Sequence, residues 1–133
     1  MSKVFVDTSV FVAIVSAEDD AREFVEMLEA TPNCLTSSLV ILESTMRLTT
    51  KQRATPARML KAVEGLLEFA EIGVMPIEAH HAQLAVDAFA KYGKGRGHPA
   101  QLNLADCLSY ACAKSRGVPL LYKGSDFART DLA

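Results

Sequence analysis

The sequence lacks any hydrophobic stretch long enough to cross a membrane. No apolar run among its 133 residues approaches the ~20 residues that a membrane-spanning helix needs. The first residues lead straight into Val4-Phe5-Val6, without the apolar stretch and small-residue cleavage site of a signal peptide. We therefore expect a cytoplasmic protein that makes no use of a membrane.

Cysteine is also scarce. The sequence has three cysteines, Cys34, Cys107 and Cys112, and none of them shows the Cys-x-x-Cys spacing. An odd number without that spacing argues against a disulfide framework and against a zinc knuckle. We expect the three side chains to be small buried hydrophobic groups.

Positive charge is not in excess either. The formal net charge is −2 and the sequence pI is about 5.9, which is not the overall signature of a nucleic-acid-binding protein. Any contact with phosphate groups must therefore use a local basic patch. Half of the residues are hydrophobic, and the length fits one domain, residues 1–133, with a substantial core.

What the sequence does contain is a regular alternation of strand and helix patterns. Short apolar, β-branched runs predict strands over 4–6, 34–36, 74–77 and 118–122, with a possible short last strand over 130–133. Apolar residues at helical spacing predict helices over 10–16, 18–30, 39–51, 56–71, 78–92 and 103–115, and a loop over 93–99. This alternation predicts an α/β domain whose parallel sheet is covered on both faces. In such folds ligands bind at the carboxyl ends of the strands.

Acidic residues stand at positions that this edge of the sheet would bring together. Asp7 follows the first strand and Asp126 follows the fourth, while Glu43 comes directly after an apolar run. Asp106 is flanked by apolar residues, and Asn103, three residues earlier, shares its helix face. Taken singly, Asp7 and Asp126 could be helix caps and Glu43 a solvated helix residue, whereas Asp106 has no obvious structural role in the middle of a helix.

Joint placement gives these residues a chemical interpretation. A carboxylate is costly to bury, and several carboxylates close together repel one another. A divalent cation such as Mg²⁺ removes this penalty because it prefers oxygen ligands, and it can activate water and stabilise charge on a phosphoryl group. The pattern therefore indicates metal-assisted hydrolysis of phosphodiester bonds.

Four motifs in this order resemble the PIN-domain ribonucleases, and in particular the VapC-type toxins of bacterial toxin–antitoxin pairs. The resemblance covers nearly the whole chain. It is carried by Val4-Phe5-Val6-Asp7-Thr8-Ser9, by Glu43, by Leu102-Asn103-Leu104-Ala105-Asp106-Cys107 and by Lys123-Gly124-Ser125-Asp126-Phe127, while Tyr92-Gly93-Lys94-Gly95 is similar to one toxin subgroup.

This resemblance implies a three-layer α/β/α domain with a central parallel sheet. It implies a magnesium-dependent endoribonuclease in which Asp7 and Asp106 bind Mg²⁺, or Mn²⁺, with support from Glu43 and Asp126. Orienting roles fall to Thr8, Ser9 and Asn103. Asp131 is a further acid that could take the fourth acidic role in place of Asp126.

The resemblance also implies the partners. The substrate would be RNA, and the chain would form homodimers and bind a small cognate antitoxin protein. Lys94 and Arg96, on the predicted loop, are candidates for contact with RNA phosphates. The helices between Leu39 and Glu71 carry more apolar residues than a core needs, so the surplus could form a groove for a partner helix.

Other readings of the sequence are weaker. A receiver-like signalling module needs an acidic pair after its first strand, but Asp7 is followed by Thr8 and Ser9. A catalytically inert α/β domain that binds RNA or protein would have little reason to keep four mutually repelling carboxylates. His80 and His81 lack the His-Glu-x-x-His spacing of a zinc site, and we expect both on a solvated helix face.

Overall fold

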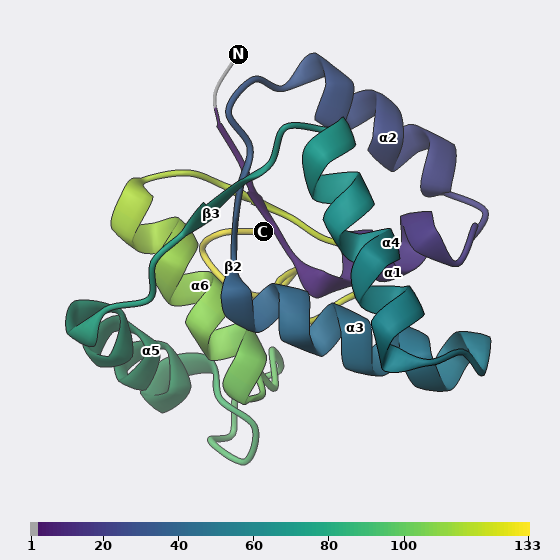
Figure 1. Cartoon of the computed structure of the whole chain (residues 1–133). Coiled ribbons are helices and arrows are strands. Elements are labelled where there is room, and N and C mark those ends of the chain that lie inside the picture. Colours follow the sequence, from purple (N-terminus) through teal and green to yellow (C-terminus); the bar gives the residue numbers. More distant parts are fainter. Residues whose placement is uncertain (1–2) are drawn as a thin grey trace.

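Four short parallel strands form the centre of the fold, in the order β3-β2-β1-β4 (Figure 1). This computed structural model describes residues 3–133, so the first two residues of the predicted domain lie outside it. The strands are β1 (Phe5–Val6), β2 (Leu35–Ser37), β3 (Gly73–Met75) and β4 (Leu120–Leu121). Because all four run in the same direction, their carboxyl ends meet at one edge of the sheet.

The central strand is held by complete burial. Phe5 and Val6 are both 0% exposed, and Phe5 is in register with Leu35 on one side and Leu120 on the other. Aromatic and β-branched side chains of this kind favour a strand that is covered on both faces. The parallel sheet expected from the sequence is confirmed.

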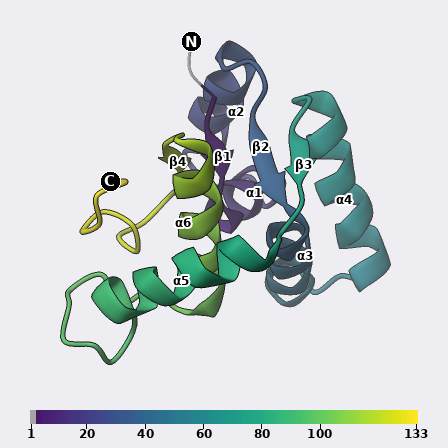
Figure 2. The same cartoon turned by 90° about the vertical axis from the view of Figure 1, so that its left-hand side faces the viewer.

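Helices cover both faces of this sheet and give the three layers (Figures 1 and 2). One side carries α6, which contacts β1, β2 and β4, and α5 packs along α6; on the other side α1 packs against α2, α3 and α4. The helices are α1 (Thr8–Val15), α2 (Ala21–Ala30), α3 (Ser38–Gln52), α4 (Pro56–Phe69), α5 (Ala79–Tyr92) and α6 (Leu104–Arg116).

Local sequence signals account for where several helices begin and end. Ser37 and Thr55 cap α3 and α4 by accepting hydrogen bonds from backbone N–H groups two or three residues into the helix, and Pro56 follows Thr55 at a position where proline is favoured. Gly117 ends α6 with a φ of +63°, a conformation that glycine adopts without strain. These signals place each helix within a few residues of its predicted range.

The three cysteines are free and buried, as expected. No helix within residues 3–133 is long and apolar enough to span a membrane.

The predicted last strand over 130–133 is wrong. These residues form turns, and their polar groups are used locally. Thr130 Oγ1 donates to the Phe127 carbonyl, and the Asp131 carboxylate accepts from the hydroxyls of Tyr92 (3.3 Å) and Tyr110 (2.5 Å). Side-chain bonds to α5 and α6, and not a strand ladder, therefore hold the end of the chain.

The expectation that His80 and His81 both face solvent is wrong for His81. This ring is 2% exposed, and its Nδ1 accepts from the Glu78 N–H at 2.8 Å in a capping box at the start of α5. The other ring nitrogen, Nε2, lies 3.0 Å from Ser115 Oγ on α6. His81 therefore caps one helix and ties it to the next.

Asp131 generates a prediction about stability in acid. Burial acts to raise its pKa, but hydrogen bonds from Lys114 and Tyr110 and the charge of Lys114 outweigh burial and lower the pKa from 3.8 to about 2. A lowered folded pKa gives stability that is present above pH 3.8 and lost as pH falls toward 2. We expect Asp131→Asn to lower the free energy of unfolding at neutral pH by on the order of 1 kcal/mol, and the loss to shrink in acid.

Urea unfolding at several pH values measures this effect. Asp87→Asn, on the exposed side of α5, makes the same charge change at an aspartate that forms no ion pair within residues 3–133, and it serves as the control. Equal stabilities of the two variants at every pH would contradict the prediction.

Candidate active site

The first acidic residue stands where β1 ends. Asp7 is the N-cap of α1, and its backbone N–H donates to the Leu121 carbonyl of β4 at 3.0 Å. Its Oδ2 accepts from the Ser9 N–H (3.1 Å) and from Ser9 Oγ (2.7 Å). The side chain is only 6% exposed, so Asp7 is both a helix cap and a buried charge at the carboxyl edge of the sheet.

Glu43 comes to this edge from the second turn of α3. The Thr8 hydroxyl donates to Glu43 Oε1 at 2.5 Å, across 35 residues of sequence. Thr8 is buried and Glu43 is half-buried, so this bond fixes the carboxylate beside the start of α1. Glu43 is therefore not the freely solvated helix residue that its position alone would allow.

Asp106 has a structural role that its sequence context did not reveal. It lies in the first turn of α6 and not in the middle, because the helix begins at Leu104 and Asn103 is its N-cap. The two side chains form a reciprocal capping box: Asn103 Oδ1 accepts from the Asp106 N–H at 2.9 Å, and Asp106 Oδ2 accepts from the Asn103 N–H at 3.1 Å. This box holds the carboxylate, which is 6% exposed, at the same edge of the sheet as Asp7.

The electrostatics show that the four acids interact. Burial is the largest cause that raises the pKa of Asp106 from 3.8 to about 7, and the charges of Asp126, Asp7 and Glu43 raise it further. Burial also raises the pKa of Asp7, with a smaller contribution from Glu43. Asp126 itself is exposed, on the turn after β4. The four predicted acidic residues therefore lie within electrostatic reach of one another.

Asp131 lies elsewhere. Its carboxylate is occupied by Tyr92, Tyr110 and Lys114, and it is absent from the charges that raise the pKa of Asp106. Of the two candidates for the fourth acidic position, Asp126 is the one whose charge acts on Asp106.

The donor set suits a hard divalent cation. Asp7, Glu43 and Asp106 each commit one carboxylate oxygen to a structural hydrogen bond, and their other oxygens, Oδ1, Oε2 and Oδ1, have no protein partner within residues 3–133. None of the ion pairs in that range neutralises any of the four acids. The carboxylates are not already arranged as a cage, since no group of three or more acidic, histidine or cysteine side chains in the described chain could hold an ion as it stands. Uncompensated oxygen ligands around a buried charge nevertheless fit Mg²⁺ or Mn²⁺.

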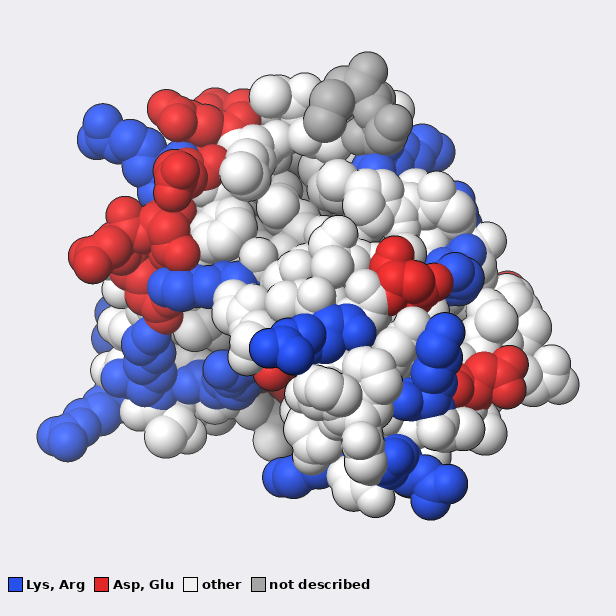
Figure 3. Space-filling model, turned by 180° about the vertical axis from the view of Figure 1, so that it is seen from behind, with Lys and Arg blue, Asp and Glu red and all other residues white. Residues whose placement is uncertain are grey.

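The predicted loop with Lys94 and Arg96 projects from the body between α5 and α6 (Figure 2). Both side chains are exposed, and the Arg96 guanidinium lies 5.6 Å from the centre of the Phe89 ring. Lys94 lines a hollow between α5 and α6 that is also lined by Asn103, the residue that caps α6 and accepts from the Asp106 N–H. Seen from behind, Lys and Arg side chains form separate groups and not one continuous basic face (Figure 3).

Comparison of the sequence with known proteins shows which family the chain belongs to. The model of the family described as "PIN domain" matches residues 4–132. The chain belongs to the PIN-domain family. Ribonuclease VapC42 of Mycobacterium tuberculosis is 41% identical over 129 residues, which cover 97% of this chain and 96% of that protein. A VapC ribonuclease of Rhizobium meliloti is 39% identical over 139 residues, covering 96% of this chain and 98% of its own length.

Solved structures agree on the fold. The crystal structure of Mycobacterium tuberculosis VapC20, described as a toxin that cleaves the sarcin-ricin loop, superposes with a TM-score of 0.78. It covers 99% of this PIN domain and 97% of its own chain, at 19% sequence identity. The three-layer α/β/α fold that the sequence predicted is confirmed, and the receiver-like alternative is wrong.

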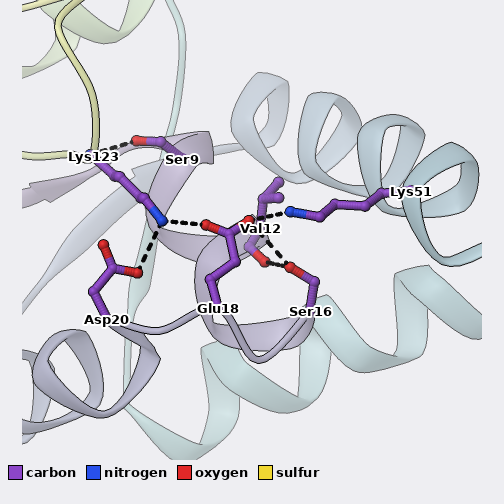
Figure 4. Close-up of polar contacts among 7 residues, drawn as sticks. All are labelled: Ser9, Val12, Ser16, Glu18, Asp20, Lys51 and Lys123. Atoms are coloured by element: carbon purple, nitrogen blue, oxygen red, sulfur yellow. Dashed lines mark hydrogen bonds and ion pairs between the residues drawn. The ribbon is translucent and has the colours of Figure 1, made fainter.

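Two residues next to this site, Lys123 and Glu18, were given no role by the sequence analysis. Lys123 lies in the fourth motif, and its backbone N–H donates to Ser9 Oγ at 2.8 Å. Its ammonium group contacts Glu18 Oε1 (2.5 Å) and Asp20 Oδ1 (3.1 Å), as Figure 4 shows. Glu18 and Lys123 are 105 residues apart in the sequence, so no local pattern pointed to the pair.

The raised pKa values predict how stability depends on pH and on metal. Between pH 3.8 and about 7 the folded domain keeps a proton on Asp106 that the unfolded chain has released. The free energy of unfolding of the metal-free protein should therefore fall as pH rises through this window. Asp106→Asn keeps an oxygen for the Asn103 N–H but removes the charge, so the variant should melt above wild type near neutral pH and lose this advantage in acid.

Thermal scans with Mg²⁺ and with EDTA test the same site. If Mg²⁺ binds only the folded protein, a concentration about 100 times its dissociation constant stabilises wild type by roughly 2.7 kcal/mol, which is a rise of several degrees in Tm. The variant should respond much less because it has lost one ligand. Identical melting curves of wild type in Mg²⁺ and in EDTA would show that the carboxylates form no metal site.

Proposed function

We propose that this PIN domain is a metal-dependent endoribonuclease that acts as the toxin of a toxin–antitoxin pair. The observation that carries the proposal is the pair of buried carboxylates, Asp7 and Asp106, held at one sheet edge with Glu43 and Asp126 in electrostatic reach. None of these four acids has a cationic side chain paired with it within residues 3–133. Burying such a group of acids without compensation opposes folding, so its presence favours a role that requires charge.

Each residue then has a separate task. Asp7 and Asp106 would hold Mg²⁺, or Mn²⁺ in its place, with Glu43 and Asp126 in support. When bound, the ion would supply Lewis acidity, which lowers the pKa of water and stabilises charge on a phosphate. Thr8 and Ser9 orient the carboxylates of Glu43 and Asp7, and Asn103 orients that of Asp106.

RNA is the proposed substrate. The relatives at about 40% identity carry the name ribonuclease, and the more distant VapC20 is described as cleaving the sarcin-ricin loop. Lys94 and Arg96, on the exposed loop between α5 and α6, would provide the local positive charge that a chain of net charge −2 needs for phosphate contacts. A nuclease acting on cellular RNA would work in the cytoplasm.

Cleavage assays test the activity. Wild type with Mg²⁺ should cut RNA, and EDTA should abolish the reaction. Asp7→Asn and Asp106→Asn should each lower kcat by at least about a hundredfold, because a carboxamide is a poor ligand, while far-ultraviolet circular dichroism stays unchanged. Asp87→Asn should cleave as wild type does. Full activity in either site variant or in excess EDTA would contradict the proposal and leave an inert binding domain as the better account.

An antitoxin would bind the outer faces of α3 and α4. Leu42, Met46 and Leu60 are 55%, 61% and 38% exposed there, whereas Val63 is buried in the core. Met46 also lines a hollow of about 550 Å³ that reaches Val12 at the end of α1. An amphipathic helix of a partner fits such a surface.

A second copy of the chain would use a different face. Val86 and Phe89 of α5 and Leu104 of α6 are 63%, 46% and 74% exposed, and they flank the hollow of about 490 Å³ between the two helices. Several large apolar side chains on one exposed face mark an association surface. We propose this face for the homodimer.

The two surfaces are separable by mutation. Met46→Glu should prevent binding of the protein encoded beside this chain and leave the size of the free toxin unchanged. Leu104→Glu should convert the dimer to a monomer, because it places a charge in an apolar interface. Each variant is the control for the other, with light scattering for size and co-purification for the partner. A wild type that is monomeric, or that binds no product of a neighbouring gene, would overturn the corresponding proposal.

A further inference from the structure

Both ends of α1 are attached to the same residue, Lys123. The backbone N–H of Lys123 reaches Ser9 at the start of the helix, and its ammonium group reaches Glu18 just beyond the end (Figure 4). One residue of the loop after β4 therefore clamps the helix whose N-cap is Asp7.

At the start of the helix this clamp orients the Asp7 carboxylate. Ser9 Oγ accepts from the Lys123 N–H at 2.8 Å and donates to Asp7 Oδ2 at 2.7 Å. A hydroxyl group has a single proton, so a donor on its lone pair helps direct that proton to the carboxylate. Successive hydrogen bonds of this kind also polarise and strengthen one another.

At the other end, Glu18 is held by the backbone of α1. The Glu18 N–H donates to the Ala13 carbonyl at 2.9 Å, and Ala17 takes a left-handed turn with a φ of +54°. Glu18 Oε1 accepts from Lys123 and Glu18 Oε2 from Lys51 of α3. These hydrogen bonds lower the pKa of Glu18 to about 2, so the side chain is ionised at neutral pH.

Glu18 thus joins three parts of the chain that surround the site: the end of α1, α3, which carries Glu43, and the loop after β4. The Glu18 side chain is 22% exposed, which makes it more sheltered than the side chains of Lys123 and Lys51, at 39% and 45%. An isolated exposed pair contributes little to stability, but a carboxylate shared between two lysines forms a network with a fixed geometry.

The loop needs this anchor because β4 has only two residues. The last backbone bond between β1 and β4 is that from the Asp7 N–H to the Leu121 carbonyl. Beyond it, Lys123 is exposed and Gly124 has a φ of +98°, so the strand ladder does not continue to the residue that contacts Ser9. Beyond the ladder, the Lys123 side chain is attached to the rest of the fold by its ion pairs with Glu18 and Asp20.

We propose that Glu18 is a positioning residue of the active site: it anchors the Lys123 side chain, which keeps the Lys123 N–H on Ser9 and thereby fixes the Asp7 carboxylate. The inference rests on the proposed function for its consequence in catalysis, but the positioning itself is a property of the metal-free protein. Two other roles are possible for these residues: a surface network that affects stability alone, and a direct contact of the Lys123 ammonium group with RNA.

Four variants separate these roles. Glu18→Gln removes the Glu18–Lys123 pair and leaves the pair with Asp20, whereas Lys123→Met removes both. Both variants keep the Lys123 backbone N–H, and Lys123→Arg restores a cation. Glu26→Gln, on an exposed part of α2 and outside the ion pairs of residues 3–133, makes the same charge change as Glu18→Gln and is the matched control.

The first measurement is amide hydrogen exchange in the metal-free protein. Exchange at the Lys123 N–H should be about tenfold faster in Glu18→Gln and in Lys123→Met than in wild type, because the amide leaves Ser9 more often. Lys123→Arg and Glu26→Gln should exchange as wild type does. Equal Lys123 exchange in Glu18→Gln and Glu26→Gln would overturn the inference, whatever the protein's activity.

The second measurement is RNA cleavage with Mg²⁺. Glu18→Gln should lower kcat about tenfold with KM within about twofold, because a misplaced carboxylate affects the reaction more than binding. Ser9→Ala should lower kcat as well, and the double variant should lose little more than Ser9→Ala alone, since both act through one chain of contacts.

Strictly additive losses would overturn the inference, and so would a Lys123→Met variant that raises KM while kcat stays at the wild-type value, since that result assigns Lys123 to RNA. A wild type that cleaves no RNA would overturn the proposed function, and the exchange experiment would still decide the positioning.

Discussion

The burial of like charges at one edge of a parallel sheet is the constraint on which the rest of this structure depends. Asp7 and Asp106 are each 6% exposed, and the charges of Asp126 and Glu43 add to the cost of ionising Asp106. A fold can keep such groups only if the surrounding structure holds them against repulsion. The fully buried strand β1 and the helices packed on both faces of the sheet provide that support, because they hold the backbone on either side of each carboxylate in place.

Helix capping explains how the buried carboxylates of Asp7 and Asp106 can be held in place and still offer an oxygen to a metal ion. A carboxylate has two oxygens. Asp7 and Asp106 each give Oδ2 to a helix start, while Oδ1 has no partner among residues 3–133. The cap fixes the direction of the side chain, and the second oxygen stays available as a ligand. A structural role and a functional role are therefore not alternatives at these positions, because the first one positions the atoms that the second one uses.

The sequence predicted most of this architecture, because strand and helix periodicity and the order of the acidic motifs are local signals. The sequence could not show features that depend on the exact first residue of a helix or on contacts between residues far apart in the chain. The helix predicted over 103–115 begins at Leu104, and this shift of one residue makes Asn103 the N-cap and places Asp106 in a capping box with it. The burial of His81 and the local role of Asp131 could not be read from the sequence, because their partners, Ser115 and Tyr110, come from other segments of the chain. The Glu18–Lys123 pair joins positions 105 residues apart, which no periodicity encodes.

Two lysine side chains, Lys123 and Lys51, lie in the same part of the fold, and both are paired with Glu18 (Figure 4). Within residues 3–133 neither ammonium group forms an ion pair with the acids of the proposed active site. Were either ammonium group to pair with Asp7 or Asp106, it would relieve the repulsion that makes the site receptive to a metal ion, and it would compete for the free oxygens. The acid at the end of α1 thus serves the acids at its start in two ways: it fixes the loop that orients Asp7, and it keeps the nearby lysines occupied. A divalent cation is then left as the partner that the buried carboxylates lack within the described chain.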